Sequence, residues 1–143
     1  MRKTACAMLA AALCAWAPLA SAAEPEQAGM RSRTNGQNFK DRALAACIAT
    51  AYEGSPSGKD ASQSTGAFLE WTYFDLEQEP ALDALIAKYL ARTYVGSPEG
   101  YADARFELLK CIDLYHGPEL EQLMHKAVPH PGWVGSAPRK PKH

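Results

Sequence analysis

Residues 110–120 read KCIDLYHGPEL and place a helix corner in the chain. Apolar side chains up to this corner recur with the spacing of one helix face: Leu108, Cys111, Ile112 and Tyr115. This periodicity predicts a helix over residues 102–116. Gly117 can adopt the left-handed conformation that ends a helix, and Pro118 favours the first position of the next one. His116 then lies in the last turn, where a cation is favoured. We therefore interpret the stretch as a corner between helices and not as a cysteine–histidine site.

On both sides of this corner, the same periodicity predicts four more helices. They cover residues 38–53, residues 60–78, a segment from residue 80 toward residue 94, and residues 118–128. The middle of the second, FLEWTYFDL at residues 68–76, carries more large apolar side chains than one stripe needs. That surplus predicts either a central position in the fold or a surface covered by another chain. The predicted class is all-α, a compact bundle of about five helices.

The first 23 residues have the three parts of a secretory signal peptide. Arg2 and Lys3 precede an apolar run, and the small residues SAAE follow it, so we expect cleavage after Ala22 or Ala23. The apolar run contains a proline and is too short to span a bilayer. We therefore expect an exported protein with no membrane insertion once the signal is removed.

The mature chain divides into three parts by composition. Residues 24–37 are polar and aperiodic and predict a flexible lead-in, residues 38–128 hold the helices, and residues 129–143 predict a flexible, proline- and glycine-rich basic tail. Cleavage after residue 23 leaves 13 basic and 16 acidic side chains, a net charge of −3. This balance argues against a nucleic-acid partner, which requires a dense basic face.

Two cysteines remain in the mature chain, Cys47 and Cys111, and each falls on the apolar stripe of its helix. In an exported chain this number predicts one disulfide, and closing a loop of 64 residues stabilises the fold by about 4 kcal/mol. A mid-helix sulfur is also poorly placed as a nucleophile. The histidines show no paired metal-ligand spacing with the cysteines, and no phosphate loop, haem motif or catalytic elbow occurs. We expect no metal, no cofactor and no catalysis.

Several motifs occur in an order that is similar to a known family. They are CIATAY at residues 47–52, the aromatic second helix, LIAKYL at residues 85–90, and KCIDLYHGPELEQL at residues 110–123. Over residues 38–128 the chain resembles the periplasmic immunity proteins of type VI secretion amidases, in the group that neutralises the fourth class of these effectors. The last motif carries most of the resemblance.

The resemblance implies a function without chemistry of its own. It implies a periplasmic homodimer whose protruding loop enters the catalytic cleft of a cognate peptidoglycan amidase, while the second subunit adds helix contacts. By position, the toxin-binding loop consists of Val95, Gly96, Ser97, Pro98, Glu99, Gly100 and Tyr101. The implied dimer would cover the surplus aromatic residues around Trp71 and Phe74.

Two other functions are compatible with the residues. One is a small periplasmic hydrolase that uses a free cysteine. The other is a non-catalytic helical module of the envelope with no toxin partner. A thiol count separates the hydrolase from the disulfide-linked protein, because a disulfide leaves neither Cys47 nor Cys111 free.

Overall fold

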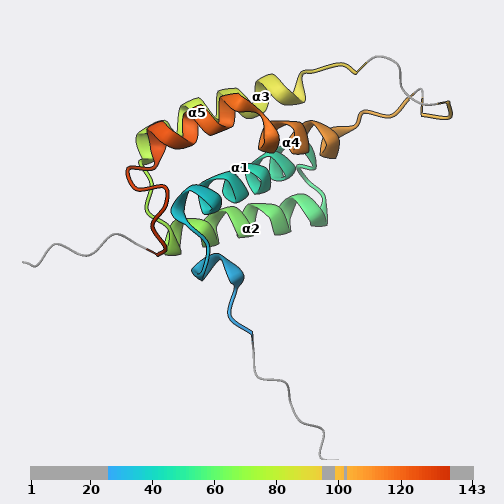
Figure 1. Cartoon of the computed structure of the whole chain (residues 1–143). Coiled ribbons are helices and arrows are strands. Elements are labelled where there is room, and N and C mark those ends of the chain that lie inside the picture. Colours follow the sequence, from blue (N-terminus) through green and yellow to red (C-terminus); the bar gives the residue numbers. More distant parts are fainter. Residues whose placement is uncertain (1–25, 95–98, 102, 136–143) are drawn as a thin grey trace, which may run out of the picture.

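The computed structural model describes residues 26–94, 99–101 and 103–135. Apart from one isolated β-bridge, their regular structure is entirely helical, which confirms the predicted all-α class. The elements are the 3-10 helices η1 (Gly29–Arg31) and η2 (Leu76–Gln78) and the α-helices α1 (Asn35–Ala51), α2 (Pro56–Trp71), α3 (Glu79–Leu90), α4 (Glu107–His116) and α5 (Pro118–Ala127). α1 contacts the four other α-helices, with α2 along one side and α3, α4 and α5 on the other (Figure 1). Among the described helices, none combines the length and hydropathy of a bilayer-spanning segment.

α1 begins three residues before the predicted position because its first amides have acceptors. Thr34 Oγ1 accepts a hydrogen bond from the Gln37 amide at 3.2 Å, and Gln37 Oε1 accepts one from the Thr34 amide at 3.0 Å. This reciprocal pair is a capping box. Asn38 Nδ2 also donates to the carbonyl of Met30 at 2.9 Å. The described end of the lead-in is thereby attached to the first helix.

The chain after α5 also contributes to the start of α1. The carbonyls of Trp133 and Pro131 accept hydrogen bonds from the amides of Asn35 and Gly36, at 2.6 and 2.9 Å. The first amides of a helix have no partner within the helix, so acceptors from elsewhere in the chain stabilise it. Pro131 and Trp133, which belong to the predicted flexible tail of residues 129–143, are therefore bonded to α1.

α2 differs from the prediction at both ends. It begins at Pro56 because Ser55 Oγ accepts a hydrogen bond from the amide of Gly58 at 3.0 Å and caps the helix. It ends at Trp71, so the prediction that this helix continues to residue 78 was wrong.

The chain leaves the helix after α2 because its groups find partners in distant segments. Thr72 is extended, and the amide of Asp75 donates to the carbonyl of Ala127, at the end of α5, at 2.7 Å. The extended backbone turns Phe74 into the core, where its ring and that of Phe39 form a T-shaped pair with centroids 5.6 Å apart. A long-range contact thus replaces local helix propensity.

The connection between α3 and α4 is longer than predicted. α3 ends at Leu90 and α4 begins at Glu107, so the predictions of a helix toward residue 94 and of another from residue 102 were wrong. Phe106, just before α4, has a φ of 53° and is the one non-glycine residue with positive φ in the described parts of the chain. Left-handed backbone cannot continue a right-handed helix, so α4 starts only after this residue.

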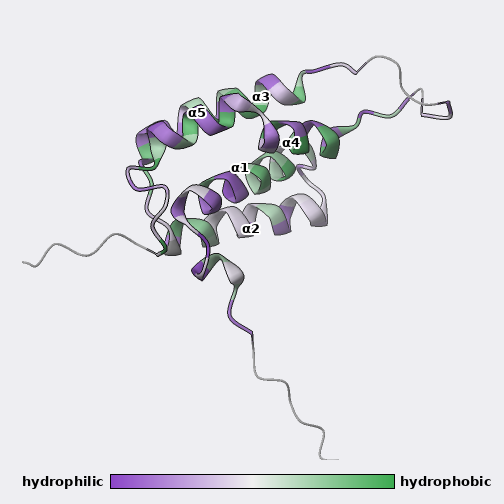
Figure 2. Ribbon diagram, viewed as in Figure 1, coloured by the Kyte–Doolittle hydropathy of each residue, from purple (hydrophilic) through white to green (hydrophobic). Residues whose placement is uncertain are grey.

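The predicted disulfide joins Cys47 of α1 to Cys111 of α4, with Cα atoms 5.6 Å apart, and both residues are fully buried. Figure 2 shows strongly hydrophobic stretches in α4 and in the adjoining part of α1, whereas α2 is of mostly intermediate hydropathy. The core around the disulfide is formed by Phe39, Ala43, Phe74, Leu82, Ile86, Tyr89, Leu114, Leu120, Leu123, Met124, Ala127 and Val128.

A buried arginine of α1 pairs with a partly buried glutamate of α3 beside this core. The guanidinium of Arg42 in α1 donates to both carboxylate oxygens of Glu79, the first residue of α3, at 2.8 and 2.6 Å. Its other neighbour is the ring of Phe74, with the guanidinium carbon 5.2 Å from the centroid. This bidentate geometry compensates part of the burial of Arg42, whose buried Nε has no hydrogen-bond partner in the described structure, and it fixes the start of α3 against α1.

The two glycines of α2 have opposite surroundings, which gives a matched pair of variants. A Cβ atom at Gly58 would overlap the backbone of Tyr52 at the α1–α2 corner, whereas nothing lies within 4 Å of one at Gly66. We predict that Gly58→Ala lowers the free energy of unfolding by about 1–3 kcal/mol through overpacking. Gly66→Ala should raise it by up to about 1 kcal/mol through helix propensity. Chemical denaturation measures both, and changes of the same sign would contradict the packing at this corner.

The disulfide should account for a large share of the stability. Because it closes a 64-residue separation, we predict that Cys47→Ala with Cys111→Ala lowers the free energy of unfolding by about 4 kcal/mol. The net stability of a domain is typically about 5–15 kcal/mol. Denaturation of the wild-type chain under reducing conditions is the control and should show a similar loss. An alanine variant as stable as the oxidised wild type would contradict the role of the bridge.

Candidate functional site

The predicted toxin-binding loop lies in the connection between α3 and α4. Val95, Gly96, Ser97 and Pro98 lie outside the described residues, whereas Glu99, Gly100 and Tyr101 are described and exposed. Gly100 has a φ of 92°, which favours glycine at this turn. Tyr101 is 57% exposed, and its carbonyl accepts a hydrogen bond from the Ala104 amide at 3.0 Å. These three residues project beyond the helices at the end of the bundle where α3 stops and α4 starts (Figure 1).

The segment that leaves α3 is held against the bundle by aromatic and polar contacts. The hydroxyl of Tyr94 donates a hydrogen bond to the carboxylate of Asp113 in α4. The guanidinium of Arg92 lies over the ring of Tyr89, with its carbon 3.4 Å from the centroid, and pairs with Glu119 at 3.9 Å. The last described residues before the loop are thus attached to α3, α4 and α5.

A shallow apolar groove lies beside the loop and was not predicted from the sequence. It has a volume of about 690 Å³ and is lined by Ala51, Tyr52, Arg105, Phe106, Glu107, Leu108, Leu109 and Ile112. Leu108 and Ile112 were predicted on the buried face of α4 but are 48% and 39% exposed. Cys111 and Leu114 are the buried residues of that helix, together with Lys110. α4 is therefore apolar on two sides, and the outer side adjoins the loop.

The residues predicted as dimer contacts have a different outcome. Phe74 is only 6% exposed and packs between Phe39 and Arg42, so it belongs to the core of this chain and offers no surface to a second copy. The physical reason is the extended backbone after α2, which turns this ring inward. Trp71 closes α2, and its side chain lies outside the described part of the structure.

Among the described residues there is no free cysteine thiol and no group of side chains that could hold a metal ion. Cys47 and Cys111 are consumed by the buried disulfide, so neither offers the free thiol that a cysteine hydrolase requires. Within the described ranges no three histidine, cysteine or acidic side chains form a group that could hold a metal ion. His130 stacks on Trp133 with centroids 4.0 Å apart. What the site offers is a projecting turn beside an apolar surface, a geometry suited to binding.

Tyr94, at the base of the loop, and Tyr115, near the other end of α4, have perturbed acidities. Burial raises the pKa of Tyr94 above the ordinary tyrosine value, and the hydrogen bond to Asp113 raises it further. Burial likewise raises the pKa of Tyr115, with a contribution from the charge of Asp41, to which its hydroxyl donates at 3.3 Å. In both cases the protonated phenol is the form that the folded protein stabilises.

Comparison with known proteins gives a consistent result. A family model described as "Tai4: Type VI secretion system (T6SS), amidase immunity protein" matches residues 37–124. No curated protein sequence matches the chain. A solved structure described as "New Type VI-secreted toxins and self-resistance proteins in Serratia marcescens" is 28% identical in sequence, with a TM-score of 0.67. That alignment covers 78% of this chain and 91% of the other.

Two further solved structures have the same fold. One is described as "Structure of the effector - immunity system Tae4 / Tai4 from Salmonella typhimurium, selenomethionine variant", with 28% identity, a TM-score of 0.62, and coverage of 71% of this chain and 96% of that one. The other contains Tae4 from Salmonella typhimurium in complex with Tai4 from Enterobacter cloacae; its similar chain is 20% identical, with a TM-score of 0.58 and coverage of 70% and 99%. At 20% identity, the structure that contains Tai4 from Enterobacter cloacae supports only the similarity of fold.

The raised pKa of Tyr94 predicts an alkaline transition at the base of the loop. A raised folded-state pKa means that the contribution of this group is fully present below the unfolded value of about 10 and is lost as the pH rises through the folded value. We predict that Tyr94→Phe removes one phenol that ionises above about pH 10. The difference between wild-type and variant absorbance titrations of tyrosinate measures it. If the ionisation that is lost in the variant occurs at or below the ordinary tyrosine pKa, the buried contact with Asp113 is contradicted.

Proposed function

The chain belongs to the type VI secretion system amidase immunity family, and from this premise we propose that it binds a cognate peptidoglycan amidase, occludes its active-site cleft and so protects the cell from intoxication. The observation that carries the proposal is the family match over residues 37–124, which extends from the first turn of α1 into the last turns of α5. The related structure from Salmonella typhimurium, described as an effector–immunity system, supports an amidase effector as the partner.

We propose that the loop of residues 95–101 makes the inhibitory contacts. Its described part supports this role, because Glu99 and Tyr101 are exposed and Gly100 allows the backbone to turn tightly. The phenol of Tyr101 combines an apolar ring with a hydrogen-bonding group, a chemistry common at the centre of protein interfaces. Inhibition by excluding the substrate requires no reactive group, so we propose that the chain itself has no enzymatic activity.

We propose that the protein acts in the periplasm, where peptidoglycan is accessible to an injected amidase. The signal peptide predicted for residues 1–23 supports this location and itself lies outside the described residues. A homodimer remains a proposal that rests on the family resemblance. Because Phe74 lies in the core, the contacts between the two subunits of such a dimer have to come from other residues.

Binding is tested by co-expressing the mature chain with a candidate cognate amidase, sought among the genes next to its own. We predict co-purification of the two proteins and loss of peptidoglycan cleavage when the immunity protein is present in equimolar amount. A matched preparation with the amidase alone gives the uninhibited rate. Undiminished cleavage in the presence of excess, correctly oxidised protein would contradict the proposed function.

The loop is tested by two substitutions in its described part. We predict that Glu99→Lys combined with Tyr101→Ala weakens amidase binding by at least about 1–2 kcal/mol, because interface hot spots lose this much on truncation. Thermal stability should be nearly unchanged since both side chains are exposed. Glu77→Lys combined with Tyr73→Ala is the matched control, with the same chemistry on exposed residues of η2 and of the chain just before it, away from the loop. Equal affinity of the two double variants would refute the loop assignment.

A further inference from the structure

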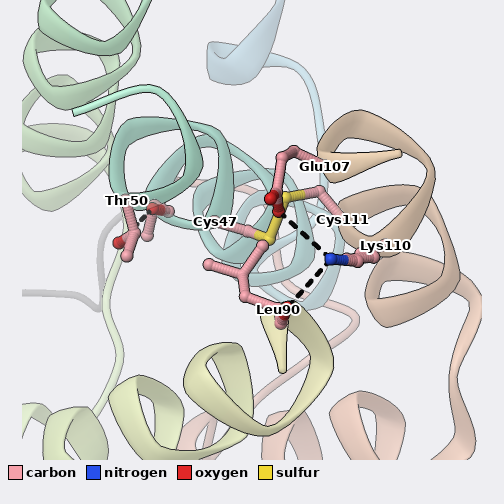
Figure 3. Close-up of a disulfide and its surroundings, with 7 residues drawn as sticks. Cys47, Thr50, Leu90, Glu107, Lys110 and Cys111 are labelled. Carbon is pink, nitrogen blue, oxygen red and sulfur yellow. Dashed lines mark hydrogen bonds and ion pairs between the residues drawn. A yellow bond between two sulfur atoms is a disulfide. The ribbon is translucent and has the colours of Figure 1, made fainter. Parts of the chain in front are cut away.

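Lys110 is a buried lysine at the point where α3 ends and α4 begins. The residue is only 8% exposed. Its Nζ donates a hydrogen bond to the carbonyl oxygen of Leu90 at 3.0 Å and lies 3.5 Å from a carboxylate oxygen of Glu107. Figure 3 shows both interactions beside the Cys47–Cys111 disulfide. Lysine is rarely buried unless its amine is paired, so these two contacts compensate its removal from water.

The two partners of Lys110 lie at the two ends of the connection that carries the toxin-binding loop. Leu90 is the last residue of α3, and Glu107 is the first residue of α4. The carbonyl end of α3 carries a partial negative charge, which favours an amine there. One amine thereby links the end of α3 to the start of α4.

The position of Lys110 is itself fixed by the disulfide. The next residue, Cys111, is bonded to Cys47 of α1, so the turn of α4 that carries Lys110 cannot move relative to α1 without breaking the core. The hydrogen bond from Tyr94 to Asp113 is a second link between the outgoing segment and α4. Lys110 and Tyr94 together attach the end of α3 and the chain beyond it to successive turns of α4.

From Glu107 a short series of contacts leads to the exposed turn. Glu107 also pairs with Arg105 at 2.8 Å, and Phe106 between them has the left-handed backbone noted above. The ring of Phe106 lies 6.4 Å from the ring of Tyr101, centroid to centroid. Displacing Glu107 would therefore displace Phe106 and, with it, the support of Tyr101.

We propose that Lys110 is a positioning residue for amidase binding: it connects the end of α3 to the first turn of α4 and so holds Tyr101 in the orientation that the amidase recognises. This inference rests on the proposed function. A turn that is already oriented before the encounter binds faster, because less conformational search accompanies association. Lys110 is buried, so it does not touch the amidase itself and influences binding only through the orientation of Tyr101.

The test uses the full mature chain with Lys110→Met and Glu107→Gln together. Replacing both members of the ion pair avoids leaving the buried carboxylate of Glu107 without the amine of Lys110, so the fold should be retained. Lys110→Arg is the conservative variant, since a guanidinium can donate to Leu90 and Glu107 alike. The matched control is Lys40→Met with Glu121→Gln, which removes the lysine–glutamate pair between α1 and α5, 2.9 Å apart and away from the loop.

Two measurements are made well below the unfolding temperature. In the free protein, we expect amide hydrogen exchange at residues 92–94 and 103–107 to rise about tenfold in the double variant. The association rate constant with the amidase should fall by about the same factor, with Lys110→Arg and the control pair close to wild type.

The possible outcomes separate this inference from the proposed function. Unchanged exchange in the double variant would overturn the link between the helix ends, and raised exchange with wild-type association would overturn its role in binding. If the control variant loses as much binding as the Lys110 double variant, the loss reflects a general effect of stability, and the proposed role of Lys110 is also overturned. If the wild-type chain itself does not bind the amidase, the proposed function falls together with the inference.

Discussion

Two cysteines that are 64 positions apart in sequence meet where α1 and α4 cross, and the arrangement of the other elements depends on this attachment. α1 contacts the four other α-helices, so a covalent bond from α1 to α4 places α4 in the same frame as the rest of the core. A chain of this size buries a modest core, and an exported protein can add stability through a disulfide. The bond also fixes the first turns of α4, which follow the projecting turn of residues 99–101 in the chain. Stability and the presentation of the loop therefore share one constraint.

Buried polar groups complement the disulfide at the helix ends. Arg42 holds the start of α3, Lys110 holds its end, and the carbonyls of Pro131 and Trp133 receive the first amides of α1. Lys110 and the two carbonyls satisfy backbone groups at helix termini that would otherwise lack partners, whereas Arg42 pairs with the side chain of Glu79. The outcome is a bundle in which chain segments outside the helices define where the helices start and stop. The exposed turn of residues 99–101 and the outer side of α4 are not needed to close the core, so their side chains can serve binding.

The parts of this structure that follow from local spacing could be predicted from the sequence. The apolar periodicity indicates five helices, and two cysteines outside the predicted signal peptide indicate one bridge. Contacts between distant segments decide the remainder: Asp75 bonds to Ala127 and ends α2 early, and the left-handed Phe106 delays α4. Phe74 fits a dimer contact by composition but lies in the core, whereas Ile112 fits the buried stripe but faces the groove. Periodicity cannot separate two apolar sides of one helix when only one of them meets the core.

We propose that the amidase binds at the end of the bundle formed by the α3–α4 connection and the outer side of α4. Hydrogen exchange of the mature, oxidised protein, measured free and in complex with the amidase, tests this claim over the whole chain in one experiment. We predict slowed exchange at residues 99–113, with α2 and α5 little changed. Slowed exchange confined to α2 and α5, with residues 99–113 unaffected, would contradict it.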